Sequence, residues 1–222
     1  MPNLWKINSE NVYILILLFF TISGFSQKEQ GSITYEMFLD LNNWRTNGEQ
    51  HPEMRLLTED MKRVSFTLLY NSEGMIFMDN RSDEEIEKMI LGIRPGFRYY
   101  YKKVAIDALF SVEKTSNGES ITTKMNYDTD WILTQESKKI NGFVCYKATR
   151  MPSQDSKEEI QNSFPIIVWY TPEIPLPYGP FVYGGLPGLI LEVQRESNVF
   201  FKAKTMRWDD NNKVKIEFPK NL

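Results

Sequence analysis

The residues that could perform nucleophilic or metal chemistry are few and lie far apart. The chain has one histidine, His51, in a polar stretch that we expect to be a loop, and one cysteine, Cys145, in a strand-like run. Zinc sites need several histidine, cysteine or carboxylate ligands, so we predict no metal site. A reactive thiolate needs a nearby base, and we therefore interpret Cys145 as a buried, small apolar residue.

Carboxylates are the remaining candidates for chemistry. Asp128 and Asp130 would share a face of a strand, but no full loop of oxygen ligands for calcium accompanies them. We therefore interpret this pair as a solvated turn. Paired carboxylates can also hydrolyse glycosides, yet no pair has a placement that the sequence defines. A hydrolase with acidic catalytic residues remains an alternative with no residues assigned to it.

Sequence signatures of the large enzyme classes are missing. We find no G-x-S-x-G nucleophile elbow, no phosphate-binding glycine loop and no dinucleotide fingerprint. We therefore predict no catalytic residue and no cofactor, and we expect a protein that is not an enzyme.

The amino-terminal stretch has the layout of a cleavable signal peptide. Lys6 precedes the apolar run Val12 to Phe20, and Gly24 and Ser26 place small residues before a cut at Gln27. The alternative is a membrane anchor, but the run is about half of the ~20 residues that a spanning helix needs. We predict that residues 1–26 are removed and that the protein is exported to the periplasm, the cell surface or the medium.

The charge and the later apolar runs exclude other classes. The formal net charge is −3 without a basic run, which is unsuited to binding nucleic acid or anionic lipid. The later apolar runs, such as Phe164 to Tyr170, have the length of strands. We therefore predict no membrane span in the mature chain.

Alternating apolar and polar side chains predict about ten strands, which must hold the residues described above. Ser82 and Glu85 predict a short helix start, and Asn117-Gly118 and Asn141-Gly142 predict hairpin turns. The predicted strands are Gly31–Leu41, Val64–Tyr70, Met75–Asp79, Arg98–Ile106, Leu109–Lys114, Glu119–Met125, a strand from Trp131, Phe143–Met151, Phe164–Tyr170, Leu189–Arg195, Val199–Trp208 and Val214–Phe218.

The order of these elements predicts the fold class. Strands follow one another at short intervals with hairpin turns and without β-α-β alternation, which favours an antiparallel sheet. We predict a mainly β chain with residues 27–222 as one domain: a single curved sheet or open half-barrel with one or two short helices. A two-sheet β-sandwich is the alternative.

The stretch from Val168 to Val193 reads VWYTPEIPLPYGPFVYGGLPGLILEV. It resembles the GLPGLI family, whose naming string is Gly185 to Ile190, and Glu192 matches the acidic residue that follows the string. The upstream segments from Gly31 and from Trp131 also look like the family. The resemblance implies an exported protein of Bacteroidota. The family is largely without an assigned activity, so no catalytic residue is carried over.

The motif itself has a physical interpretation. Leu186 to Leu189 fits a type II turn, with Pro187 presetting φ and Gly188 accepting a positive φ. The motif-turn residues, which we expect to be structural, are Gly184, Gly185, Leu186, Pro187, Gly188, Leu189 and Ile190. The continuous apolar run that follows predicts a strand covered on both faces, with the proline-rich segment as a lid on one side.

Aromatic residues around this lid are the candidate ligand-binding residues, because apolar and aromatic linings suit small-molecule sites. They are Trp169, Tyr170, Tyr178, Phe181 and Tyr183. We hypothesise an exported, non-catalytic binding or assembly protein; a carrier of a lipid or other apolar ligand is the alternative beside the hydrolase. The partner is unknown, and an outer-membrane receptor, which would make the protein outer membrane-associated, is suggested by the compartment alone.

Overall fold

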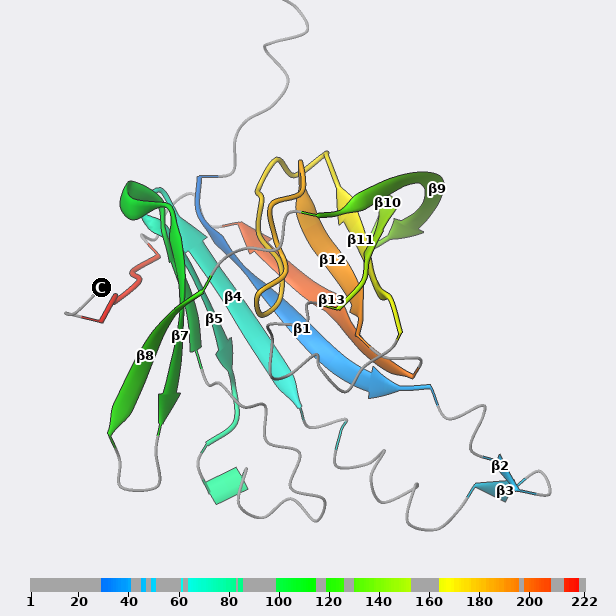
Figure 1. Cartoon of the computed structure of the whole chain (residues 1–222), viewed down its shortest axis with the longest axis horizontal. Helices are drawn as coiled ribbons and strands as arrows, with labels where there is room; N and C mark the ends of the chain where they lie inside the picture. Colours follow the sequence, from blue (N-terminus) through cyan, green and yellow to red (C-terminus); the bar gives the residue numbers. More distant parts are fainter. Residues whose placement is uncertain are drawn as a thin grey trace, which may run out of the picture.

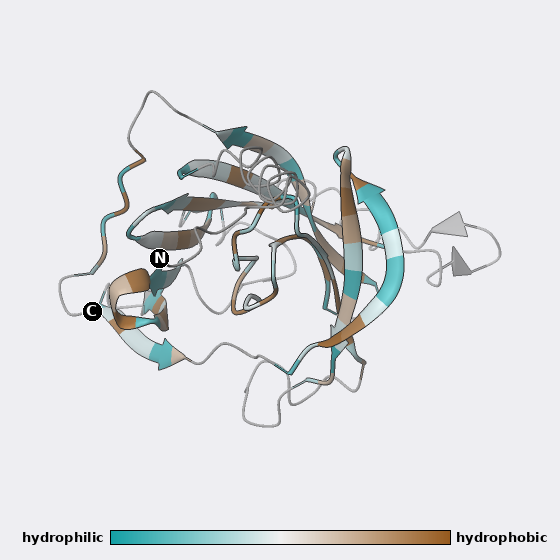
Figure 2. Ribbon diagram, turned by 90° about the horizontal axis from the view of Figure 1, so that it is seen from above, coloured by the Kyte–Doolittle hydropathy of each residue, from teal (hydrophilic) through white to brown (hydrophobic). Residues whose placement is uncertain are grey.

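Eleven strands form one antiparallel sheet, in the order β8-β7-β6-β5-β4-β1-β13-β12-β11-β10-β9. The computed structural model describes residues 29–40, 45–46, 49–50, 61, 64–82, 84–85, 99–114, 119–125, 130–152, 164–195, 198–208 and 214–219. The single curved sheet predicted from the sequence is confirmed, and the eleven strands are not split into the two sheets of a sandwich (Figures 1 and 2).

The strands of the sheet are β1 (Gly31–Leu39), β4 (Ser65–Asn71), β5 (Gly74–Asp79), β6 (Tyr99–Lys103), β7 (Ala108–Lys114), β8 (Ser120–Met125), β9 (Ile132–Ile140), β10 (Phe143–Arg150), β11 (Ile166–Thr171), β12 (Leu189–Gln194) and β13 (Val199–Trp208). A separate two-stranded ladder, β2 (Arg45–Thr46) with β3 (Glu49–Gln50), lies within the stretch that we expected to be a loop.

The sheet consists of two meanders that meet at β1. Strands β4 to β8 follow one another on one side, and β9 to β13 follow one another on the other side. Strand β1 pairs with β4 along one edge and with β13 along the other. The central seam of the sheet therefore joins segments from far apart in the chain (Figure 1).

Turn chemistry explains the hairpins. Asn141 and Gly142 have φ of 50° and 89°, which matches the primed turn predicted for Asn-Gly. Between β4 and β5 we expected a four-residue loop, but the strands continue through Asn71 and Gly74 and leave only two turn residues. Gly74 has a positive φ of 155°, and a Cβ there would lie 1.9 Å from the Lys102 carbonyl oxygen.

Two predicted strands differ from the structure. The run from Arg98 to Ile106 ends as a strand at Lys103, and a 3-10 turn covers Val104–Ile106. The run from Val214 to Phe218 is not a strand, because side chains satisfy its backbone: Val214 N donates to Gln30 Oε1 at 3.0 Å, and Asn71 Nδ2 donates to Val214 O at 2.9 Å.

This carboxyl-terminal segment still buries apolar surface. Ile216 packs in a small second cluster with Ile76, Tyr101 and Val112, and the Phe218 ring lies 6.0 Å from the Tyr101 ring. The segment thus covers the face of β5 to β7 that points away from the main core.

The predicted helix start is present as a capping box. Ser82 N donates to Glu85 Oε2 at 2.7 Å, and Glu85 N donates to Ser82 Oγ at 3.2 Å. The described residues do not include residues 86–90, the predicted signal peptide, His51 or Asp128. Within the described part of the chain, no helix has the length and apolar character required to cross a membrane.

Candidate functional site

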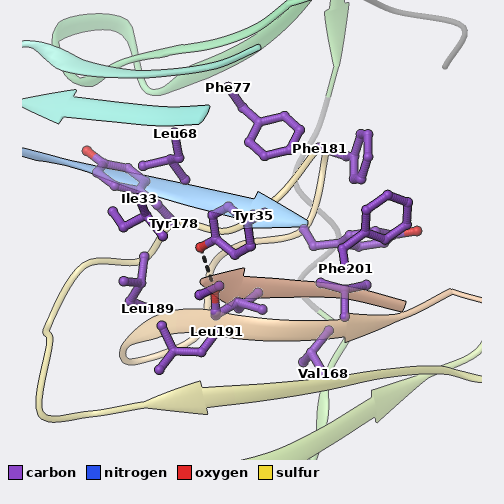
Figure 3. Packing of buried hydrophobic residues seen from close by; sticks show 14 of the residues in the cluster. Ile33, Tyr35, Leu68, Phe77, Val168, Tyr178, Phe181, Leu189, Leu191 and Phe201 are labelled. Carbon is purple, nitrogen blue, oxygen red and sulfur yellow. Dashed lines mark hydrogen bonds between the residues drawn. The ribbon is translucent and has the colours of Figure 1, made fainter. Parts of the chain in front are cut away.

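The motif segment between β11 and β12 packs on the side of the sheet that carries the main core, called here the core face (Figures 1 and 3). Its backbone is held at several points: Leu189 N donates to Ile174 O at 2.9 Å, and Ile190 N donates to Tyr178 O at 3.0 Å. The buried Tyr35 hydroxyl on β1 donates to Ile190 O at 2.7 Å, and burial raises the pKa of this phenol. The predicted lid is therefore a built-in part of the core.

Phe181 lies at the centre of this packing. Its ring centroid is 4.7 Å from Phe201, 4.9 Å from Phe77, 5.3 Å from Phe66 and 5.9 Å from Tyr100 (Figure 3). Its φ of 55° is rare for a residue with a side chain. The surrounding rings, contributed by four strands, keep Phe181 in this unfavourable conformation.

Trp131 and Arg150 anchor the same segment from the β9–β10 side. Trp131 Nε1 donates to Gly184 O at 2.9 Å. The Arg150 guanidinium lies 5.5 Å from the ring centroids of both Trp131 and Tyr183. Trp131, which comes just before β9, therefore supports the motif segment, although it lies 53 residues from Gly184 in the sequence.

The predicted type II turn at the motif is wrong. The positive φ belongs to Gly185, at 76°, and not to Gly188. Gly188 is needed for a different reason, because a Cβ there would lie 2.1 Å from the Thr171 carbonyl oxygen. The glycine permits close approach of two backbones at the start of β12.

The structure does not bring the five candidate ligand-binding aromatics around one groove. Four of them, Tyr170, Tyr178, Phe181 and Tyr183, are buried in the main core. The Tyr178 ring, for example, lies 6.5 Å from Tyr70. Trp169 alone among the five is partly exposed.

The strand register places Trp169 on the opposite face. Residues directly opposite each other in an antiparallel pair share a face. One continuous register row across five strands consists of Glu36, Lys202, Glu192, Trp169 and Lys147, and we call it the outer row. The next row along the strands is apolar and buried, and consists of Met37, Phe201, Val193, Val168 and Ala148.

Glu192 organises the charges of the outer row. Its side chain is only 7% exposed, and it contacts Lys138 Nζ at 2.6 Å and Lys202 Nζ at 3.0 Å. Lys138 Nζ also lies 4.2 Å from the centre of the Trp169 ring, within cation–π range. Further along the row, Lys147 pairs with Glu136 at 2.8 Å.

Cys145 is buried, as predicted, and it lies opposite Lys138 in the β9–β10 register. Burial raises the pKa of its thiol to about 11, so the thiol is protonated at neutral pH. A nucleophilic role is therefore not supported.

Two of the described carboxylates that are buried, Asp79 and Glu192, pair with basic side chains. The Asp79 side chain is buried beside Arg81 at 2.5 Å, and it lies opposite the core residue Phe66. Glu192 lies on the outer row. In the described ranges, no group of three or more histidine, cysteine or acidic residues could hold a metal ion.

Sequence reasoning identified Trp169 and Glu192 but missed their lysine partners. Lys202 and Lys204 alternate with the buried Phe201 and Ala203, which signals an outward charged face. Lys138 reaches Glu192 from a strand three positions away in the sheet, and no local pattern indicates such a contact.

Comparisons with known proteins are consistent with this fold and give no activity. A family model described as a protein of unknown function (Porph_ging) matches residues 150–192, which include β11, the motif segment and Glu192. Two crystal structures of PNGF-II, in space groups C2 and P21, are similar over 83% of this chain, with a TM-score of 0.55 and identities of 18% and 19%.

The similarity covers 28% and 29% of the PNGF-II chains, so this chain spans less than a third of their length. At this level of identity the likeness concerns the fold alone. No curated protein matches the chain.

Proposed function

We propose that this chain is an exported, non-catalytic binding or assembly protein of the GLPGLI type, and that it contacts its partner through the outer row around Trp169. The observation that carries the proposal is the position of Trp169. It is the one predicted ligand-binding aromatic that is partly exposed, and it lies between Lys147 and the buried Glu192 in the register.

Tryptophan is enriched at the energetically important positions of protein interfaces. Lys138 covers the Trp169 ring, and Glu192 holds Lys138 in place. The indole therefore has a fixed orientation before any partner arrives, which lowers the entropic cost of binding.

The alternative of a carrier for an apolar ligand has less support. Such a carrier would shelter its ligand against the core face. There, Phe181 and the rings around it, together with Tyr178 and Leu189, occupy the space in front of the sheet (Figure 3).

The test is native mass spectrometry of the protein purified from its own cell envelope. We expect a mass beginning at Gln27 together with a bound partner. The Trp169→Ala variant should lose the partner, whereas Ile121→Ala, a matched change at an exposed apolar residue on β8, should keep it. A partner retained by both variants would rule out the surface around Trp169, and a bare wild-type mass would argue against stable binding altogether.

A further inference from the structure

The charges on the outer row do not balance locally. The row and the side chains paired with it carry four ammonium groups and three carboxylates. Lys147 pairs with Glu136, and Lys204 pairs with Glu36. The excess positive charge therefore lies on Lys138 and Lys202, which share Glu192.

The shared carboxylate fixes the two lysines close together. Glu192 is buried, whereas the side chains of Lys138 and Lys202 are 35% and 42% exposed. Each ammonium carries three N–H donors, and contact with Glu192 directs one ammonium to each carboxylate oxygen. The other donors are left for groups outside the described protein contacts.

The two lysines are held in different ways. Lys138 Nζ donates a short hydrogen bond of 2.6 Å to Glu192 Oε1. Lys202 Nζ lies 3.0 Å from Oε2, but the geometry is not that of a hydrogen bond, and Oε2 accepts none from the described residues. Lys202 is thus held to Glu192 by charge attraction without a hydrogen bond, so its ammonium can turn towards a second acceptor.

We propose that Lys138 and Lys202 together bind an oxyanion, meaning a carboxylate, sulfate or phosphate group of the partner. An oxyanion placed between them receives charge-assisted hydrogen bonds from both ammonium groups and neutralises the excess charge. This inference rests on the proposed binding function, because it assigns the chemistry that the same surface recognises.

Aromatic rings flank this lysine pair on both sides and define what surrounds the anionic group. Trp169 lies under Lys138, and Phe38 lies 5.8 Å from Lys202 Nζ. Phe38 is 40% exposed and stacks on Phe200 with ring centroids 6.2 Å apart. The site therefore suits an anionic group, including one carried on a body with apolar or flat faces.

The experiment is an NMR titration of the mature chain with inorganic phosphate, at a constant ionic strength set by sodium chloride. We expect saturable shifts of backbone amide signals near Lys138, Glu192 and Lys202. Lys202→Gln should raise the Kd at least about tenfold, the size expected for losing one charge-assisted hydrogen bond. Lys102→Gln is the matched control, because Lys102 lies on β6, outside the outer row, and has its own carboxylate, Asp107, at 2.8 Å. Its Kd should stay within about twofold of wild type.

Two outcomes would overturn the site: amide shifts that do not saturate, or an equal loss of affinity in the Lys102 and Lys202 variants. Sedimentation with phosphatidylglycerol vesicles separates the sources of the anion. Co-sedimentation that Lys202→Gln abolishes indicates a lipid headgroup, whereas phosphate binding without co-sedimentation indicates a soluble oxyanion.

The same variants separate this inference from the proposed function. If Trp169→Ala loses the envelope partner while Lys138→Gln and Lys202→Gln keep it at wild-type level, the binding surface stands and the oxyanion site is refuted. If all three variants keep the partner and phosphate still titrates the lysine pair, the oxyanion site stands and the partner surface is elsewhere.

Discussion

The two faces of β11 to β13 differ sharply although they are built from the same strands. On the core face, the motif segment is packed among aromatic rings and held by backbone hydrogen bonds. On the other face, the outer row presents lysines, glutamates and one tryptophan, partly exposed to water. The string from Gly185 to Ile190 thus serves the fold, and the residues of our proposed binding surface lie on the other side of the sheet.

This contrast teaches that a strong sequence signature need not mark a functional site. Gly188 satisfies a steric demand of the core face, because a Cβ there would lie 2.1 Å from the Thr171 carbonyl oxygen. Trp169 and Glu192 lie in the same stretch of sequence but point the other way, since neighbouring residues of a strand alternate between faces.

The largest expected effect is on the core face. Phe181→Ala should lower the free energy of unfolding by about 4 kcal/mol, because it removes a ring that contacts four others and leaves a cavity. Urea denaturation measures the change. Phe38→Ala, which removes a 40% exposed ring on the other face, should cost less than about 1 kcal/mol. Equal losses would show that the two faces are equally important for stability.

A second prediction concerns close backbone contact. Gly188→Ala should destabilise by about 3 kcal/mol, because the new Cβ would lie 2.1 Å from the Thr171 carbonyl oxygen, and one of the two backbones must move. Gly142→Ala is the control: its Cβ meets nothing within 4 Å, but its positive φ should cost about 1 kcal/mol. Thermal unfolding measures the loss of stability in both variants. A smaller loss in Gly188→Ala than in Gly142→Ala would contradict the close packing at Gly188.

On the outer row we expect smaller losses of stability. Glu192→Gln removes the buried carboxylate between two lysines, and should cost about 1 kcal/mol, because both lysines are exposed enough to be rehydrated. Glu36→Gln, at a more exposed carboxylate of the same row, should cost less than about 0.5 kcal/mol. Urea denaturation at low and high salt measures both, and a Glu192→Gln loss as large as that of Phe181→Ala would mean that the outer row supports the fold.

The smallest effect is a pH dependence from Cys145. Its thiol pKa is raised from 9.0 to about 11 in the folded chain, so the unfolded chain releases this proton at lower pH. The contribution of the protonated thiol to stability is therefore complete below pH 9 and declines as the pH rises towards 11. Urea denaturation across this pH range measures the free energies of unfolding of wild type and Cys145→Ala. The difference between the two should shift in favour of the variant as the pH rises. A constant difference would show that the thiol is not shielded.

Much of the fold was predictable because it depends on local patterns. The alternation in β1 and β13 and the Asn141-Gly142 turn were recognised from neighbouring residues alone. The apolar segment from Val214 was misinterpreted as a strand, because burial against a sheet and pairing with a strand leave the same apolar signature.

The candidate site was less predictable because it depends on register. Knowing that Glu192 faces Lys202 and Trp169 requires the pairing of β11, β12 and β13, and the first of these pairs contains an irregularity after Trp169. A shift of one residue exchanges the two faces of a strand, so the sequence alone could not separate Trp169 from the buried aromatics beside it.

The pairing of β1 with β13 has a consequence for how the chain acquires its structure during synthesis. The ribosome makes Gly31–Leu39 early and Val199–Trp208 late, yet these strands pair along nearly their whole length at the centre of the sheet. Each meander can begin to form as it emerges, whereas the central seam must wait until almost the whole chain has been made. A sheet that is closed at its centre by its last strand, β13, therefore stays incompletely paired while the strands before β13 are synthesised.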